Sequence, residues 1–273
     1  MKKLIILSLI SLVLFSCKED DVPYPPTLGA GTVTITKEGQ TVRIPIESEM
    51  EILDVVMDGS AEDWCTYEWS QTEIIAVVAD NKLTPREVTF TLKAEVRDGT
   101  ATLKQEGRNI NDFKQYDMAN WEVSSVSDEI ESDGGGAKSI LDLDDPHGTY
   151  WHNNWGSASA TLPHWIVIDM KEEIEIDMIQ LGWRKYGEKY YYYNKVTEVY
   201  VGNSPNQAQI TNRVGLLKTP ATDGTSSDKY QPYHNVGLDA NKGRYLKLVI
   251  PESNSGQNSI IAYVKAYKYE GTD

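Results

Sequence analysis

The stretch Arg244-Tyr245-Leu246-Lys247-Leu248-Val249-Ile250-Pro251 decides the fold class of the second half of the chain. Its even-numbered positions from 246 to 250 are aliphatic, and an extended chain would place them on one side. Tyr245, Lys247 and Val249 would then face the other side. The pattern predicts a strand in a sheet with one buried face.

Similar stretches occur along the whole chain. In the second half we predict strands at Trp165–Met170, Ile174–Trp183, Lys195–Gly202, Arg244–Pro251 and Ile261–Tyr269. In the first half we predict strands at Thr32–Thr36, Val42–Glu47, Ile52–Met57, Trp64–Trp69, Ile74–Ala79, Arg86–Val96 and Thr100–Gln105. No repeat of 20–50 residues is visible, which excludes solenoids and propellers. The sequence predicts an all-β protein, with an immunoglobulin-like β-sandwich followed by a second β-sandwich.

The composition limits the classes of partner. The chain has 273 residues, of which 40% are hydrophobic and 25% charged, as expected for one or two folded domains. The formal charge of −15 would repel a phosphate backbone, so we expect no nucleic-acid partner. The 16 Tyr and 7 Trp outnumber the 3 Phe, and aromatic rings with a polar atom suit wet surfaces and polar ligands.

The N-terminus has the features of an export signal. Lys2 and Lys3 precede the apolar stretch Leu4–Phe15, which is too short to span a bilayer comfortably. Ser16-Cys17 resembles the bacterial lipobox, which implies that residues 1–16 are removed and that Cys17 becomes a lipidated N-terminus. The alternative is an ordinary secretory signal with a chance cysteine.

Residues 17–30, which begin at Cys17, are predicted to form a spacer. Its acidic run Lys18–Asp21 resembles the surface-export signal of Bacteroidetes lipoproteins. The alternative is a solvated linker that carries no targeting signal. Three prolines within Val22–Pro26 favour an extended, stiff chain. We therefore expect a protein anchored by lipid in the outer membrane and exposed at the cell surface.

Residues 31–107 resemble the BACON-type immunoglobulin-like domain. The resemblance rests on Trp64-Cys65-Thr66-Tyr67, on Asp80-Asn81 followed by Pro85-Arg86, and on the closing stretch Ala101–Gly107. It implies a spacer module and assigns no site. Trp64 and Trp69 are interpreted as core residues, because a Trp on a half-buried sheet is more often packed inside than exposed.

Residues 112–270 resemble the coagulation-factor type C, or discoidin, family. The matching blocks are Trp121, Thr149–His152, Pro163–Asp169, Arg184 and Gly243–Leu248. The resemblance implies a galactose-binding-like jelly roll, a fold that in bacteria includes the carbohydrate-binding modules of family 32.

The same resemblance implies a sugar site in the loops at one end of the sandwich. Its positions here are His152, Trp155 and Arg184, where an aromatic ring would stack on the sugar and the Arg fork would bind neighbouring hydroxyls. Tyr190–Tyr193 are four consecutive tyrosines, so about two must point outward beside Arg184. We include Tyr186 and Tyr191 in the predicted glycan-binding set; the alternative is an edge strand packed on a neighbouring loop.

An acidic loop, Asp142–Thr149, is the predicted metal site. Asp-rich loops supply the oxygen ligands that Ca²⁺ prefers, and the resemblance implies structural calcium here, with Asp142 or Asp144 as the leading ligand and Thr149 nearby. The resemblance also implies a Glu near the C-terminus, but Tyr263 stands at that position. The alternative is a solvated acidic turn without metal.

The sequence gives little support for catalysis. The four His residues show no metal-ligand spacing, and no motif of a catalytic nucleophile is present. We expect a non-catalytic surface lipoprotein that captures a glycan and, from family context alone, passes it to an outer-membrane uptake complex. The alternative is an adhesin or structural accessory protein whose discoidin-like domain binds a protein partner.

Overall fold

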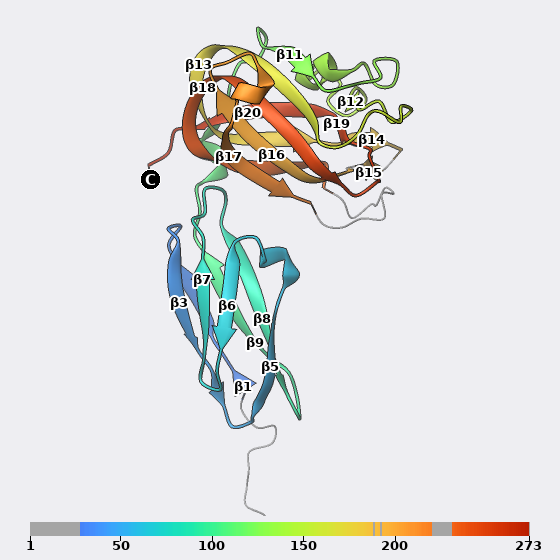
Figure 1. Ribbon diagram of the computed structural model, residues 1–273. Coiled ribbons are helices and arrows are strands. Elements are labelled where there is room, and N and C mark those ends of the chain that lie inside the picture. Colours follow the sequence, from blue (N-terminus) through green and yellow to red (C-terminus); the bar gives the residue numbers. More distant parts are fainter. Residues whose placement is uncertain (1–27, 188, 192, 220–230, 273) are drawn as a thin grey trace, which may run out of the picture.

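A computed structural model describes residues 28–187, 189–191, 193–219 and 231–272. Figure 1 shows two β-sandwiches, one formed by the first part of the chain and one by the rest. The helical turns are the short 3₁₀ segments η1 (Gly59–Ala61), η2 (Ile110–Asp112), η3 (Ala137–Leu141) and η4 (Gln207–Gln209). Among the residues described, no helix has the length and apolar character needed to cross a membrane. The predicted all-β fold class is confirmed.

The first sandwich packs a four-stranded sheet against a three-stranded sheet. The first sheet has the order β2 (Thr32–Ile35), β9 (Gly99–Gln105), β8 (Arg86–Ala94), β5 (Ile52–Met57), and the second has the order β3 (Gln40–Pro45), β7 (Glu73–Val78), β6 (Cys65–Trp69). A short pair, β1 (Leu28–Gly29) and β4 (Glu47–Ser48), begins before residue 31, where we predicted the first domain to start. Alternate residues of both sheets, such as Ile44 and Phe90, are fully buried between them.

The two tryptophans of this sandwich belong to its packing. Trp64 and Trp69 are partly buried and lie against the core cluster. The Arg86 guanidinium lies 4.2 Å from the centre of the Trp64 ring. The guanidinium also donates to the carbonyl oxygens of Ala79 and Asp80, at 2.8 and 3.1 Å. The face of Trp64 next to Arg86 is therefore covered.

The second sandwich is built on one large sheet. Its order is β10 (Phe113–Gln115), β20 (Tyr263–Tyr269), β13 (His164–Gly182), β18 (Tyr233–Ser253), β16 (Asn194–Gly202), β17 (Asn212–Lys218), with β11 (Glu122–Val126) paired to β13. Two small pairs flank it, β12 (Trp151–His152) with β19 (Ile260–Ile261) and β14 (Arg184–Tyr186) with β15 (Lys189–Tyr191).

Strand β13 joins two stretches that the sequence predicted as separate strands. Between them Lys171 has a φ of 71°, and the register with β18 shifts between Asp169 and Ile174. The chain bends at this irregularity without leaving the sheet. The bend lets one strand pair with β11 at its start and with β20 at its end, which closes the sheet around a core that includes Trp151 and Trp183.

Between the two sandwiches, residues 110–115 form η2 and β10. The Arg108 guanidinium lies 4.4 Å from the centre of the Tyr269 ring and 3.7 Å from the buried carboxylate of Asp177. The backbone N–H of Arg108 donates to the carbonyl of Leu83 at 2.7 Å. Arg108 therefore contacts a loop of the first sandwich and the last strand of the second.

Candidate functional site

A glycine turn positions an acidic side chain at one end of the second sandwich. Gly134, Gly135 and Gly136 follow Asp133 and all have positive φ, between 76° and 100°. A Cβ on Gly134 would lie 2.4 Å from the Tyr150 ring, and the Gly134 carbonyl accepts from the Tyr150 N–H at 2.8 Å. Only glycine has no Cβ and tolerates such φ values easily. The turn therefore holds Asp133 against strand β12.

The Asp133 carboxylate accepts three side-chain hydrogen bonds. One oxygen accepts from the Tyr150 hydroxyl at 2.6 Å, and the other accepts from His152 Nδ1 at 2.8 Å and Trp155 Nε1 at 3.2 Å. Partial burial raises the pKa of Asp133, but the three donors outweigh it and hold that pKa below its usual range. Burial and the bond to Asp133 raise the pKa of Tyr150 to about 12. Asp133 is therefore ionised, and its hydrogen bonds orient the side chains of Tyr150, His152 and Trp155.

One ring nitrogen of His152 forms a hydrogen bond, and the other has no hydrogen-bond partner among the described residues. The carboxylate of Asp133 requires a proton on Nδ1, so the neutral ring has an acceptor at Nε2. Burial lowers the pKa of His152, although the bond to Asp133 opposes the shift. Nε2 is buried and has no hydrogen-bond partner among the described residues. An unpaired buried acceptor is costly, and a ligand O–H would satisfy it.

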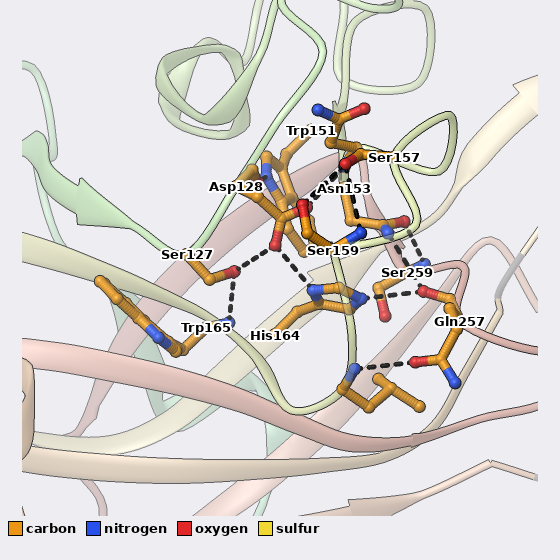
Figure 2. Close-up of polar contacts among 12 residues, drawn as sticks. Ser127, Asp128, Trp151, Asn153, Ser157, Ser159, His164, Trp165, Gln257 and Ser259 are labelled. Carbon is orange, nitrogen blue, oxygen red and sulfur yellow. Dashed lines mark hydrogen bonds and ion pairs between the residues drawn. The ribbon is translucent and has the colours of Figure 1, made fainter.

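Trp155 is the most exposed tryptophan ring of this region, with 56% of its surface accessible. A buried polar network holds its loop, as Figure 2 shows around Asp128, His164 and Gln257. Asp128 accepts from the Asn154 N–H at 2.6 Å and from His164 Nδ1 at 2.9 Å. His164 Nε2 in turn contacts the Gln257 carbonyl at 2.8 Å. His164 is fully buried with both nitrogens occupied, so its role is structural.

Arg184 lies beside these rings on β14. Its guanidinium stacks 4.4 Å from the centre of the Tyr150 ring and 5.7 Å from that of Tyr186. Within the described parts of the chain the guanidinium forms no hydrogen bond or ion pair. Stacking orients the group while its N–H donors stay available.

The predicted tyrosines extend the cluster. Tyr186 is 67% exposed and meets the Tyr191 ring edge-on at 6.4 Å. Tyr191 meets Tyr193 at 6.2 Å, and Tyr193 meets the His152 ring at 6.1 Å. All five residues predicted for glycan binding therefore lie in one connected cluster, which we call the loop site. It comprises Asp133, Tyr150, His152, Trp155, Arg184, Tyr186, Tyr191 and Tyr193.

Comparison with known proteins identifies the second sandwich. The family model described as the F5/8 type C domain matches residues 122–265, which is more than half of the chain. The chain belongs to the F5/8 type C family. This confirms the discoidin part of the sequence resemblance and the galactose-binding-like jelly roll. No curated protein matches the chain.

Part of this chain is similar to several solved structures. The C-terminal domain of a chitobiase from Bacteroides fragilis is 23% identical, with 58% of this chain and 100% of that chain covered and a TM-score of 0.46. A CBM32 module from Clostridium perfringens, in complex with GalNAc-β-1,3-galactose, is 16% identical, with 57% and 100% covered and a TM-score of 0.45. The family 32 module of NanJ from C. perfringens, in complex with galactose, is 15% identical, with 57% and 99% covered and a TM-score of 0.41.

The acidic loop of this type C domain, residues 142–149, is closed by hydrogen bonds of its own. Asp142 accepts from the Asp144 N–H at 3.0 Å, and the Thr149 hydroxyl donates to the Asp145 carbonyl at 3.1 Å. Among the residues described, no group of three or more His, Cys, Asp or Glu side chains could hold a metal ion. Tyr263 is buried and donates its hydroxyl to Gln180 Oε1 at 3.0 Å. Asp142 and Thr149 thus form hydrogen bonds within the loop, and the described acidic side chains do not converge there as a set of three.

Sequence reasoning missed three residues of the loop site. Asp133, Tyr150 and Tyr193 were not predicted to contribute to it. The run Asp133-Gly134-Gly135-Gly136 was the available signal for Asp133, because three glycines after an acid indicate a backbone turn that presents the acid. Tyr193 carried no such signal, since four consecutive tyrosines do not show which ring turns inward.

Proposed function

We propose that this type C domain binds carbohydrate at the loop site without catalysing a reaction. The observation that carries the proposal is the convergence of three groups: the exposed Trp155 ring, and His152 Nε2 and the Arg184 N–H donors, which have no hydrogen-bond partner among the described residues. A sugar supplies the complement of each, because it has an apolar C–H face and neighbouring hydroxyls that donate and accept hydrogen bonds.

Each group has a distinct role in the proposed complex. One face of the sugar ring stacks on Trp155, while His152 Nε2 accepts from one hydroxyl and the Arg184 fork donates to two vicinal oxygens. Asp133 does not touch the sugar in this arrangement. It fixes the tautomer of His152 and the orientation of the Trp155 ring, so that the site needs little reorganisation on binding.

A binding role without catalysis agrees with the charges at the loop site. Glycoside hydrolysis uses a pair of carboxylates, one of which acts as a general acid. Within the loop site Asp133 is the one carboxylate, and its oxygens already accept three hydrogen bonds. Its lowered pKa keeps it ionised and unsuited to donate a proton at neutral pH.

We further propose that the chain is a lipoprotein anchored through Cys17 and exposed on the outer membrane, where it captures a glycan for an uptake complex. Residues 1–27, including Cys17 and the acidic run, lie outside the described residues. The support is the sequence pattern alone. Labelling of cells with a radioactive or clickable fatty acid, compared between the wild type and Cys17→Ser, tests the anchor directly.

A glycan array tests the binding role. The wild type should retain a coherent set of glycans, and Trp155→Ala should lose them with an unchanged melting curve. Leu53→Ala removes an equally exposed side chain from the first sandwich, at 54% exposure, and should bind normally. A blank array with folded wild-type protein would contradict glycan binding and favour a protein partner instead.

A further inference from the structure

A groove lies on the outer face of the large sheet, apart from the residues of the loop site. Its cavity volume is about 450 Å³, within the range of small-molecule sites. We call it the Trp165 groove. Its lining includes Trp165, Tyr200, Gln207, Thr211, Lys247 and Val249.

The strand register brings the groove residues together. Trp165 on β13 is directly opposite Val249 on β18, and Tyr200 on β16 is directly opposite Lys247. Lys247 and Val249 are two residues apart, so all four side chains stand on one face. Leu246 and Leu248 point to the other face and into the core. The groove is therefore part of the sheet surface that faces away from the core.

Lys247 is a buried cation at the inner end of this groove. Only 7% of the residue is exposed, and its Nζ donates to the Gln207 carbonyl at 2.8 Å and lies 4.5 Å from the centre of the Tyr200 ring. In the described parts of the chain, no carboxylate forms an ion pair with it. Glu198, the nearby acid, is bonded to the Tyr200 hydroxyl at 2.8 Å and to Arg213 at 3.0 Å.

A buried ammonium without a counterion is unfavourable for the folded protein. An ammonium has three N–H donors, and among the described residues Nζ has one hydrogen-bond acceptor, the Gln207 carbonyl. Burial lowers the pKa of Lys247, which reports the cost of its charge. A ligand carboxylate at Nζ would supply both the missing charge and further hydrogen-bond acceptors.

The remainder of the groove fits a flat, hydroxylated ring. The partly buried Trp165 offers an aromatic wall, and Gln207 and Thr211 offer polar groups at the rim. Stacking on an aromatic ring suits the C–H face of a sugar, and the amide and hydroxyl suit its hydroxyls. We propose that the Trp165 groove binds an acidic sugar residue, with its carboxylate at Lys247 and its ring against Trp165. This inference does not depend on the loop site.

Matched sugar ligands test the charge requirement. Methyl β-D-glucuronoside and methyl β-D-glucoside share a ring and differ in the carboxylate, so titration of the full-length protein followed by saturation-transfer NMR compares them directly. We expect the glucuronoside to bind at least tenfold more tightly and to lose affinity at high salt. Equal affinity for the two sugars, or no binding of the glucuronoside by folded protein, would overturn the proposal.

Variants locate the binding. Lys247→Met keeps the apolar stem and removes the charge, and it should abolish the preference for the glucuronoside. Thr211→Trp fills the groove from an exposed rim position, so it should block binding even if Lys247→Met fails to fold. Leu53→Ala, outside both sites, should leave glucuronoside binding unchanged. Loss in Trp155→Ala but not in Thr211→Trp would assign the acid to the loop site, and equal binding of N-acetylglutamate would exclude a sugar-specific groove.

Discussion

The Nδ1 atom of His152 lies 2.8 Å from the Asp133 carboxylate oxygen that also accepts the indole N–H of Trp155 at 3.2 Å. One oxygen therefore sets both the tautomer of the imidazole and the angle of the exposed ring. His152 is buried and Trp155 is exposed, so the pair joins the interior of the sandwich to its surface. The proposed sugar contacts depend on a residue that itself stays beneath the ligand.

Asp133→Asn should weaken glycan binding at least fivefold. The Asn amide can donate a hydrogen bond to His152 Nδ1, so the imidazole proton is no longer fixed on that atom. Calorimetric titration with a glycan selected on the array measures the loss. ¹⁵N NMR of the imidazole provides a readout that a merely structural role would not change, since Nε2 should acquire a proton in a fraction of the molecules. Unchanged tautomer and unchanged affinity would contradict the positioning role of Asp133.

Arg184→Lys should reduce glycan affinity about tenfold, because an ammonium cannot donate a planar pair of hydrogen bonds to vicinal oxygens. Stability should change by less than about 1 kcal/mol, which is the usual value of an exposed cation–π contact. Arg213→Lys on β17 is the matched control, since that guanidinium is exposed and lies outside the loop site. Equal affinities of Arg184→Lys and wild type would remove Arg184 from the binding set.

The partly buried His234 should make the fold sensitive to acid. Its neutral Nδ1 accepts from Trp183 Nε1 at 2.8 Å, and burial lowers its pKa to about 4. The unfolded chain gains this proton near pH 6.5, so the free energy of unfolding should fall between about pH 6.5 and 4, by up to about 3 kcal/mol. Urea unfolding at several pH values measures the slope. His234→Gln keeps an acceptor without titrating, and an identical slope in that variant would refute the assignment.

Gly182→Ala should destabilise the second sandwich by about 1–3 kcal/mol, the usual cost of overpacking. A Cβ at this position would lie 2.0 Å from a ring carbon of Tyr263, the residue that replaces the expected Glu. The cost should shrink in a Tyr263→Leu background, where the opposing ring is smaller. A double-mutant cycle by chemical unfolding measures this coupling, and additive effects would show that the two residues do not meet.

Calcium should leave the melting temperature unchanged. A native-state site filled at 100 times its Kd would add about 2.7 kcal/mol to the free energy of unfolding. Melting curves of the full-length protein with excess calcium and with a chelator therefore give a clear answer. A rise with calcium that Asp142→Asn abolishes would restore the calcium site that the family resemblance implies.

The strands could be predicted because the alternation of buried and exposed residues is a local property of each strand. Alternation such as that of residues 246–250 depends only on which face of one strand is buried. The predicted core strands are present, although β18 begins at Tyr233 and not at the predicted Arg244. Strand β10 was missed because it has three residues and its partner β20 is distant in sequence. Strand β17 was missed because its buried residues, Val214 and Leu217, do not alternate. The polar residues around Lys171 do not alternate either, so the bend of β13 was predicted as a break between two strands.

The sequence by itself determined the all-β class, the order of the two sandwiches and the type C resemblance with its histidine, tryptophan and arginine. Tertiary structure decided which side chains meet. It brought Asp133 next to His152 and Trp155 and turned Tyr193 toward the His152 ring. It also left Lys247 buried beside Tyr200, with no ion pair among the described residues. These contacts join residues from separate strands and loops, so their energies depend on the closed sheet and have no counterpart in any local stretch of the chain.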